Sequence, residues 1–194
     1  MKKLYLPQPD EKTGIIPQFD GYFDLKEIDL SVYKNASVVG TIFHDYSGED
    51  VQGMQAGKQA DIVELLYQME DITTPDNKAK NYVYYEARTL HDSSLSKAIH
   101  SITACDLGME KEAYEMFMSA ALTDLGQEMK SSDAGIHSAN MGGVWQDVVM
   151  GFGGIRIRDG HLRIAPNCPK QWEKFTYPIY WKGNKLDVTV CKDG

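Results

Sequence analysis

The stretch DSSLSKAIHSITACDLG, residues 92–108, is the clearest single indication of how this chain folds. Asp92 and Ser93 are residue types that favour the N-cap of a helix, because their side-chain oxygens accept hydrogen bonds from the first backbone amides. Gly108 stands where a glycine commonly follows the last turn of a helix. The stretch therefore predicts a helix with its own start and stop signals.

Helical patterns continue on both sides of this stretch. Four further segments are predicted to be helices, and they are residues 60–69, 76–86, 110–124 and 138–150. Short polar links between these segments indicate successive antiparallel helices. Residues 1–46 are interrupted by prolines and glycines instead, and they predict an irregular arm with one short helix at 26–34.

The period of the pattern changes after residue 150. Isoleucines and leucine alternate with arginines on either side of Asp159-Gly160, a dipeptide that is typical of a two-residue hairpin turn. A second hairpin is predicted over 175–191, with its turn at Gly183-Asn184. The fold class is therefore mostly α with a C-terminal antiparallel β portion. Two hairpins are too few for an independently stable sheet, so we expect this end to pack on the helices.

Composition excludes several classes of protein. The 194 residues contain 20 Lys+Arg against 28 Asp+Glu, a net charge of −8, which predicts no nucleic-acid or membrane-surface partner. No apolar run approaches the roughly 18 to 20 residues that span a bilayer. Three cysteines without metal-ligand spacing predict neither a metal site nor a disulfide framework. The first residues do not resemble an export signal, so we expect a cytoplasmic protein.

Ser93, Ser94 and His137 are candidates for binding an anion. The two serines stand at the start of the helix predicted before Gly108, and helix N-termini leave backbone amides and a partial positive charge that attract anions. His137 also precedes a predicted helix, next to small residues that allow close approach to an oxyanion or a sugar hydroxyl. Two alternatives remain open: the serines serve only as helix caps, and His137 is a buried histidine that is hydrogen-bonded within the fold.

Lys58 and Gln59 are candidates for binding a polyhydroxylated ligand. Lysine donates hydrogen bonds and glutamine both donates and accepts them, a combination that suits sugar hydroxyls. A solvated helix end explains the same pair equally well. Glu86 is the last candidate, but glycoside chemistry usually needs two carboxylates across the scissile bond, and the sequence offers Glu86 no convincing partner.

Four motifs together resemble glycoside hydrolase family 65. They are KQAD at 58–61, YYEARTLHDSSLS at 84–96, GIHSANMGGVWQ at 135–146 and GFGGIRIRDG at 151–160. This family holds inverting phosphorylases of the maltose, kojibiose, trehalose and nigerose types, and some trehalases. The likeness runs from about residue 14 to the end of the chain, in the order of the family.

The resemblance implies an architecture. Family members are several times longer and carry a β-sandwich, an (α/α)6 barrel and a small C-terminal β domain. Residues 47–150 are accordingly expected to be part of the barrel, and 151–194 an incomplete β domain. The general-acid glutamate of the family lies in a Gly-Pro-Asp-Glu-Tyr type motif that this sequence lacks. We therefore expect no catalytic residue here and no turnover by this chain alone, with Glu86 and Arg88 as a supporting ion pair.

The resemblance also implies roles for the binding candidates. Lys58 and Gln59 would hold hydroxyls of the glucosyl unit, while Ser93, Ser94 and His137 would bind the attacking phosphate. The implied partners are a disaccharide or glucose, with inorganic phosphate as co-substrate and no other cofactor. The implied reaction converts an α-disaccharide and phosphate to β-glucose 1-phosphate and a sugar.

Two other functions remain open. The chain is then either a catalytically inactive module that binds sugar or phosphate, or part of a trehalase-type hydrolase. A pocket of two serines and a histidine favours phosphorolysis, because inverting hydrolysis needs a carboxylate to deprotonate water. An arc of a barrel exposes apolar stripes, so we also expect self-association, or association with the rest of the barrel.

Overall fold

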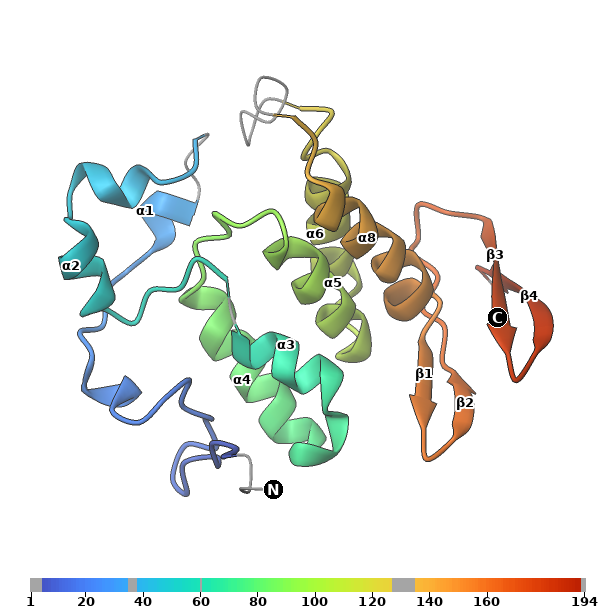
Figure 1. Cartoon of the computed structure of the whole chain (residues 1–194), viewed down its shortest axis with the longest axis horizontal. Coiled ribbons are helices and arrows are strands. Elements are labelled where there is room, and N and C mark those ends of the chain that lie inside the picture. The colour runs from blue at the N-terminus through green and yellow to red at the C-terminus, as the bar shows by residue number, and fades with distance from the viewer. Residues whose placement is uncertain (1–4, 35–37, 60, 127–134, 193–194) are drawn as a thin grey trace.

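The computed structural model describes residues 5–34, 38–59, 61–126 and 135–192 (Figure 1). Its helices are α1 (Ser31–Lys34), α2 (Gly48–Gln52), α3 (Asp61–Gln68), α4 (Pro75–Ala87), α5 (Ser96–Asp106), α6 (Glu110–Ala121) and α8 (Ser138–Gln146). A π-helical turn, η4 (Asp147–Phe152), follows α8 directly. The strands are β1 (Ile155–Arg158), β2 (His161–Ile164), β3 (Lys174–Trp181) and β4 (Asn184–Cys191). The predicted fold class, helices followed by antiparallel strands, is confirmed.

Helices α5, α6 and α8 lie side by side (Figure 1). Two glycines bring α5 and the α8–η4 segment together: a Cβ on Gly143 would lie 3.0 Å from Ala98 Cβ, and one on Gly151 would lie 3.5 Å from Ile102 Cα. The first contact joins Ala98 to Gly143, and the second joins Ile102 to Gly151, so the residue numbers increase in the same direction along both segments. Helices α5 and α8 therefore run parallel, and their N-termini lie at the same end of this layer.

The strands form two separate hairpins, β1–β2 and β3–β4. Aromatic rings attach the second hairpin to the helices. The Phe152 side chain is 1% exposed, and its ring centroid lies 5.3 Å from that of Phe117 on α6 and 5.1 Å from that of Trp172. Trp172 in turn contacts Phe175 on β3 at 5.3 Å between centroids. The expectation that the strands pack on the helices is confirmed.

The first hairpin turns where the sequence predicts, and one of its arginines is buried. Asp159 and Gly160 both have a positive φ, as a two-residue hairpin turn requires. A half-buried strand usually buries its apolar residues and exposes its charged ones, yet Ile157 is 56% exposed and Arg156 only 6%. The reason is an ion-pair network: Arg156 Nε lies 2.9 Å from Glu70 Oε1, and Arg156 Nη2 lies 2.8 Å from Asp106 Oδ1.

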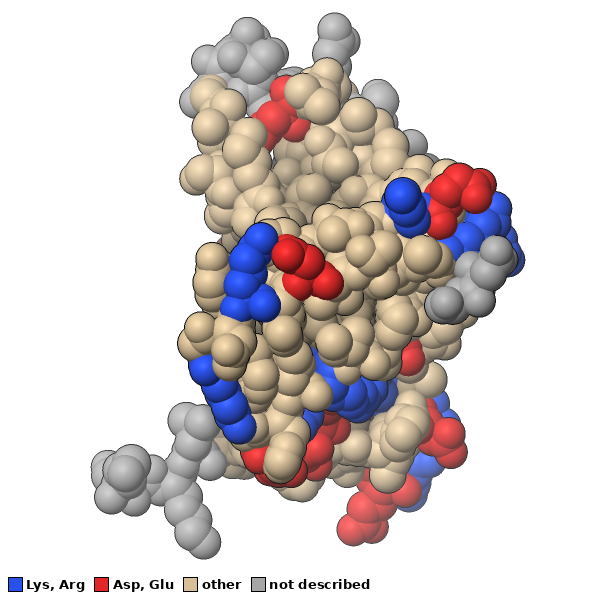
Figure 2. Space-filling model, turned by 90° about the vertical axis from the view of Figure 1, so that its right-hand side faces the viewer, with Lys and Arg blue, Asp and Glu red and all other residues tan. Residues whose placement is uncertain are grey.

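The described surface bears on the expected partners. On the face that carries the hairpins, lysine and arginine side chains lie beside aspartate and glutamate and do not gather into one basic area (Figure 2). None of the helices among the described residues is long and apolar enough to cross a membrane.

Several apolar side chains of α8 and the end of α6 are exposed, among them Met141, Trp145 and Leu122. Self-association through such faces stays a prediction.

Candidate functional site

The loop between α4 and α5 contains the predicted phosphate-binding serines. Helix α5 begins at Ser96 with Leu95 at the N-cap, and no side chain caps this position. The predicted capping of α5 by Asp92 or Ser93 is therefore wrong. The Asp92 carboxylate accepts a hydrogen bond from the amide of Gly40 at 3.1 Å instead, and Ser93 Oγ accepts one from the amide of Leu95 at 3.3 Å. Both side chains shape the loop rather than the helix end.

Lys58 and Gln59 lie beside this loop because of a backbone bridge. The amide of Leu90 donates to the carbonyl oxygen of Gly57 at 2.8 Å, which fixes the segment just before Lys58 against the segment just before the loop. Burial raises the pKa of Asp92, and the positive charge of Lys58 opposes that rise. Gln59 lines a small cavity of about 50 Å³ together with residues at the start of α5.

His137 stands at the start of α8 and is oriented by Asp124. The Nδ1 atom of His137 lies 2.7 Å from Asp124 Oδ1, and its backbone amide donates to Asp124 Oδ2 at 2.9 Å. Because a carboxylate oxygen only accepts, Nδ1 of His137 carries a proton and donates it to Asp124, and Nε2 points away from Asp124. The N-termini of α5 and α8 lie at the same end of the layer. His137 and the loop between α4 and α5 that contains Ser93 and Ser94 (the serine loop) therefore lie at that end as well.

The structure thus places the residues that the sequence singled out toward one end of the helical layer. Lys58 and Gln59 are exposed next to the loop, Ser94 is partly buried within it, and Ser93 is buried. Their roles in binding stay predictions.

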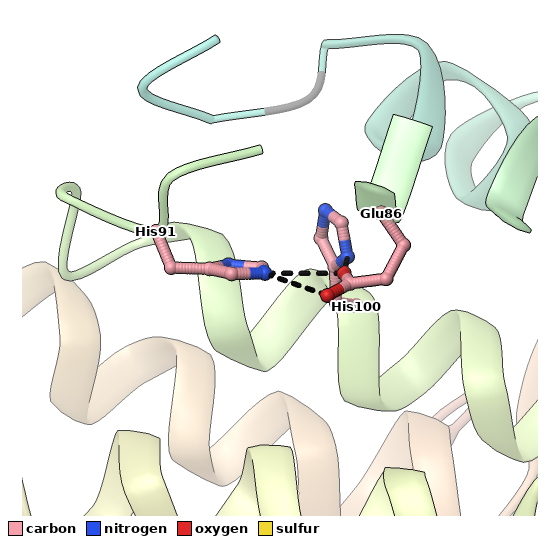
Figure 3. Close-up of side chains that lie close together, drawn as sticks. All are labelled: Glu86, His91 and His100. Carbon is pink, nitrogen blue, oxygen red and sulfur yellow. Dashed lines mark hydrogen bonds and ion pairs between the residues drawn. The ribbon is translucent and has the colours of Figure 1, made fainter. Parts of the chain in front are cut away.

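Glu86 contacts three basic side chains from different segments, and Figure 3 shows the two histidines among them. Its Oε1 lies 2.7 Å from Lys34 Nζ on α1, and its Oε2 lies 3.1 Å from His91 Nε2 in the loop. Oε2 also contacts Nδ1 of His100, a fully buried residue on α5. Sequence reasoning missed Lys34 and the joint arrangement, since no local pattern connects positions that lie 52 residues apart.

The predicted ion pair between Glu86 and Arg88 is wrong. Arg88 Nη2 binds Glu27 Oε1 at 3.0 Å, and its Nε donates to Gln55 Oε1 at 3.0 Å. The reason is helical geometry, because side chains two residues apart on a helix point in different directions. Arg88 therefore faces the segment of Glu27, while Glu86 faces the two histidines and Lys34.

Electrostatics fixes the charge states in this cluster. Burial opposes ionisation of Glu86, but hydrogen bonds from His100 and His91 outweigh it and hold the pKa of Glu86 well below its usual range. Burial lowers the pKa of His91 to about 4. At neutral pH Glu86 is therefore a carboxylate and His91 is neutral. Since the carboxylate can only accept, His91 Nε2 carries the proton and Nδ1 accepts from Ser96 Oγ at 3.0 Å.

The same three side chains are the ones among the described residues that offer a set of ligand atoms for a metal ion. One atom each from Glu86, His91 and His100 lies within 4.8 Å of the others. The ammonium group of Lys34 already supplies a positive charge to Glu86. A metal ion would compete with this ammonium group and with the protons on the two imidazoles.

Acidification should destabilise the fold through His91. In the folded chain His91 stays neutral down to a pKa of about 4, whereas the unfolded chain binds that proton near the ordinary value of 6.5. The stabilisation is therefore complete above pH 6.5 and is lost as the pH falls toward 4, by roughly 3 kcal/mol in all. Urea unfolding across this range measures the loss. In a His91→Asn variant this part of the pH dependence should vanish, and an unchanged slope would contradict the assignment.

A larger cavity lies at the opposite end of α5. Its volume is about 550 Å³, and its walls include Cys105, Asp106 and Leu107 of that end together with Lys78 and Arg163. The predicted phosphate and glucosyl residues do not line it. They lie toward the N-terminal ends of α5 and α8 instead, so cavity size alone does not locate the predicted site.

Comparison with known proteins places the chain in a family. A model of the glycosyl hydrolase family 65 central catalytic domain matches residues 1–146, and a model of the C-terminal domain of that family matches 155–194. The kojibiose phosphorylase of Halothermothrix orenii is 45% identical over 98% of this chain and 24% of its own length. The α,α-trehalose phosphorylase of Thermoanaerobacter brockii is 36% identical, with the same coverage of 98% and 24%.

A solved structure agrees with this assignment. A candidate kojibiose phosphorylase from the human microbiome superimposes with a TM-score of 0.86 at 32% identity, over 96% of this chain and 26% of that one. The chain spans about a quarter of the length of the curated relatives that it matches. Its helices and strands are thus part of an (α/α)6 barrel with a small β domain. The chain belongs to glycosyl hydrolase family 65.

Proposed function

We propose that this chain supplies the phosphate- and glucosyl-binding residues of an inverting disaccharide phosphorylase. One observation carries the proposal: Ser93 and Ser94 before α5, and His137 before α8, lie at the same end of two parallel helices. Helix N-termini, hydroxyl groups and an imidazole bind phosphate without a cluster of cations. This arrangement suits a chain whose net charge is −8.

The mechanism follows from the charge of phosphate. In an inverting hydrolase a carboxylate must deprotonate water, whereas phosphate arrives as an anion and needs only positioning opposite the leaving group. Ser93, Ser94 and His137 hold the phosphate, while Lys58 and Gln59 hold hydroxyls of the glucosyl unit. A phosphate oxygen then bonds to the anomeric carbon as the glycosidic bond breaks, which gives β-glucose 1-phosphate. A general acid outside this chain protonates the departing sugar oxygen.

Glu86 does not suit the role of a hydrolytic base. Its two oxygens contact Lys34, His91 and His100, so a water molecule would have to displace one of these donors. The hydrogen bonds that hold the pKa of Glu86 low also make it a poor proton acceptor. This supports phosphorolysis over trehalase-type hydrolysis.

A hybrid enzyme tests the proposed function. We would replace the matching quarter of the Halothermothrix orenii kojibiose phosphorylase with this chain and measure glucose 1-phosphate formed from kojibiose and phosphate. We expect phosphorolysis by the hybrid enzyme and none by the 194-residue chain alone. Glucose release that does not depend on phosphate would contradict the proposal, as would a folded hybrid without activity toward kojibiose or trehalose.

A further inference from the structure

Glu86 connects four separate segments of the chain. It stands in the last turn of α4 and contacts Lys34 of α1, His91 of the serine loop and His100 of α5. In this cluster the Glu86 carboxylate faces the ammonium group of Lys34 and a neutral His91. Ion pairs and hydrogen bonds that converge on one largely buried carboxylate rigidify the segments that they join.

His91 connects Glu86 to the loop between α4 and α5. Its ring donates from Nε2 to Glu86 and accepts at Nδ1 from Ser96 Oγ, so it bridges the end of α4 and the first residue of α5. The residues between these anchors include Ser93 and Ser94. His91 itself has a left-handed backbone, with φ of +57°. A non-glycine residue adopts this conformation only where its surroundings hold it.

We propose that Glu86 is a positioning residue for bound phosphate: it fixes the His91 ring, and the ring holds the left-handed turn that presents Ser93 and Ser94. This inference rests on the proposed function, because it assumes that the two serines bind phosphate. Glu86 itself need not touch the ligand. Lys34 neutralises Glu86 and thereby makes the α1 segment part of the support of the site.

Phosphate binding to the 194-residue chain tests this inference. Isothermal titration calorimetry with inorganic phosphate gives the dissociation constant, and circular dichroism gives the melting temperature. We expect Glu86→Gln to weaken phosphate binding about tenfold or more, as the loss of one hydrogen bond to a charged group would. The matched control is Glu27→Gln, which breaks the neighbouring ion pair with Arg88. It should leave phosphate binding unchanged.

Nitrogen NMR of the imidazoles supplies a readout that general destabilisation would not change. The unsubstituted chain should show His91 protonated on Nε2, and Glu86→Gln should shift His91 toward a mixture of tautomers. Should Glu86→Gln fail to fold, His91→Asn is the second variant. Asparagine tolerates a left-handed backbone but cannot reach Glu86 as the ring does, so we again expect binding about tenfold weaker.

The outcomes separate this inference from the proposed function. Normal phosphate binding by folded Glu86→Gln or by His91→Asn overturns the inference and leaves the proposed function intact. No phosphate binding by the unsubstituted chain, together with an inactive hybrid enzyme, removes both. If both single variants fold, their losses should not add in the double variant, because Glu86 acts through His91. Additive losses would also overturn the inference.

Discussion

Replacing Ser93 and Ser94 together by alanine should lower kcat/KM of the hybrid enzyme for phosphate by about 10²- to 10⁴-fold. Each hydroxyl is expected to donate one hydrogen bond to an anion, and such bonds contribute about 1.5–3 kcal/mol each. Single-turnover and steady-state phosphorolysis of kojibiose measure the effect. KM for phosphate should rise far more than KM for the disaccharide, because the serines are proposed to contact only the phosphate.

A matched control for this variant lies in the C-terminal hairpin. Thr189→Ala on β4 removes one exposed hydroxyl, which contacts Thr176 on β3 at 2.9 Å and lies far along the chain from the loop. We expect its kcat/KM to stay within about twofold of that of the hybrid enzyme, as is usual for a surface substitution. Equal losses in the control and in the double alanine variant would contradict the assignment of the serines to phosphate.

Phe152→Ala should lower the free energy of unfolding by about 3–5 kcal/mol, the usual loss for truncating a buried phenylalanine. Phe152 is 1% exposed and stands edge-on to both Phe117 and Trp172. It therefore belongs at once to the helical core and to the contact with the second hairpin. Urea denaturation followed by tryptophan fluorescence measures the loss, and Trp172 reports directly on this cluster.

The control for Phe152→Ala is Phe43→Ala, the same substitution at a side chain that is 57% exposed. Its free energy of unfolding should change by less than about 0.5 kcal/mol. A loss of under about 1 kcal/mol in Phe152→Ala would show that the hairpin and the helices are not held by this cluster.

Local signals account for the parts of the fold that the sequence predicted. The helix of residues 96–106 and its stop at Gly108, which has φ of +70°, follow from periodicity and from the conformational freedom of glycine. Asp159-Gly160 produces a hairpin turn because both residues tolerate a positive φ. Each of these features depends on residues close together in the chain.

Long-range pairing explains features that the sequence did not predict. Arg156 is buried because Glu70 and Asp106, which are 86 and 50 residues away, neutralise its guanidinium group. Asp92 does not cap α5 because its carboxylate binds the amide of Gly40, 52 residues away. No pattern along the sequence contains these partners, since hydrophobic periodicity describes which residues are apolar and not which charges meet.

The sequence by itself determined the class of the fold, the family and the set of candidate residues. Lys58, Gln59, Ser93, Ser94 and His137 were identified from their residue types and from the motifs around them. Only the tertiary structure decided how these residues are supported. Parallel packing of α5 and α8 brings two helix N-termini to one end, and the fold closes Lys34, His91 and His100 around Glu86. The type of each residue and its neighbours can be read along the sequence. Burial and charge pairing depend on segments that meet only after folding.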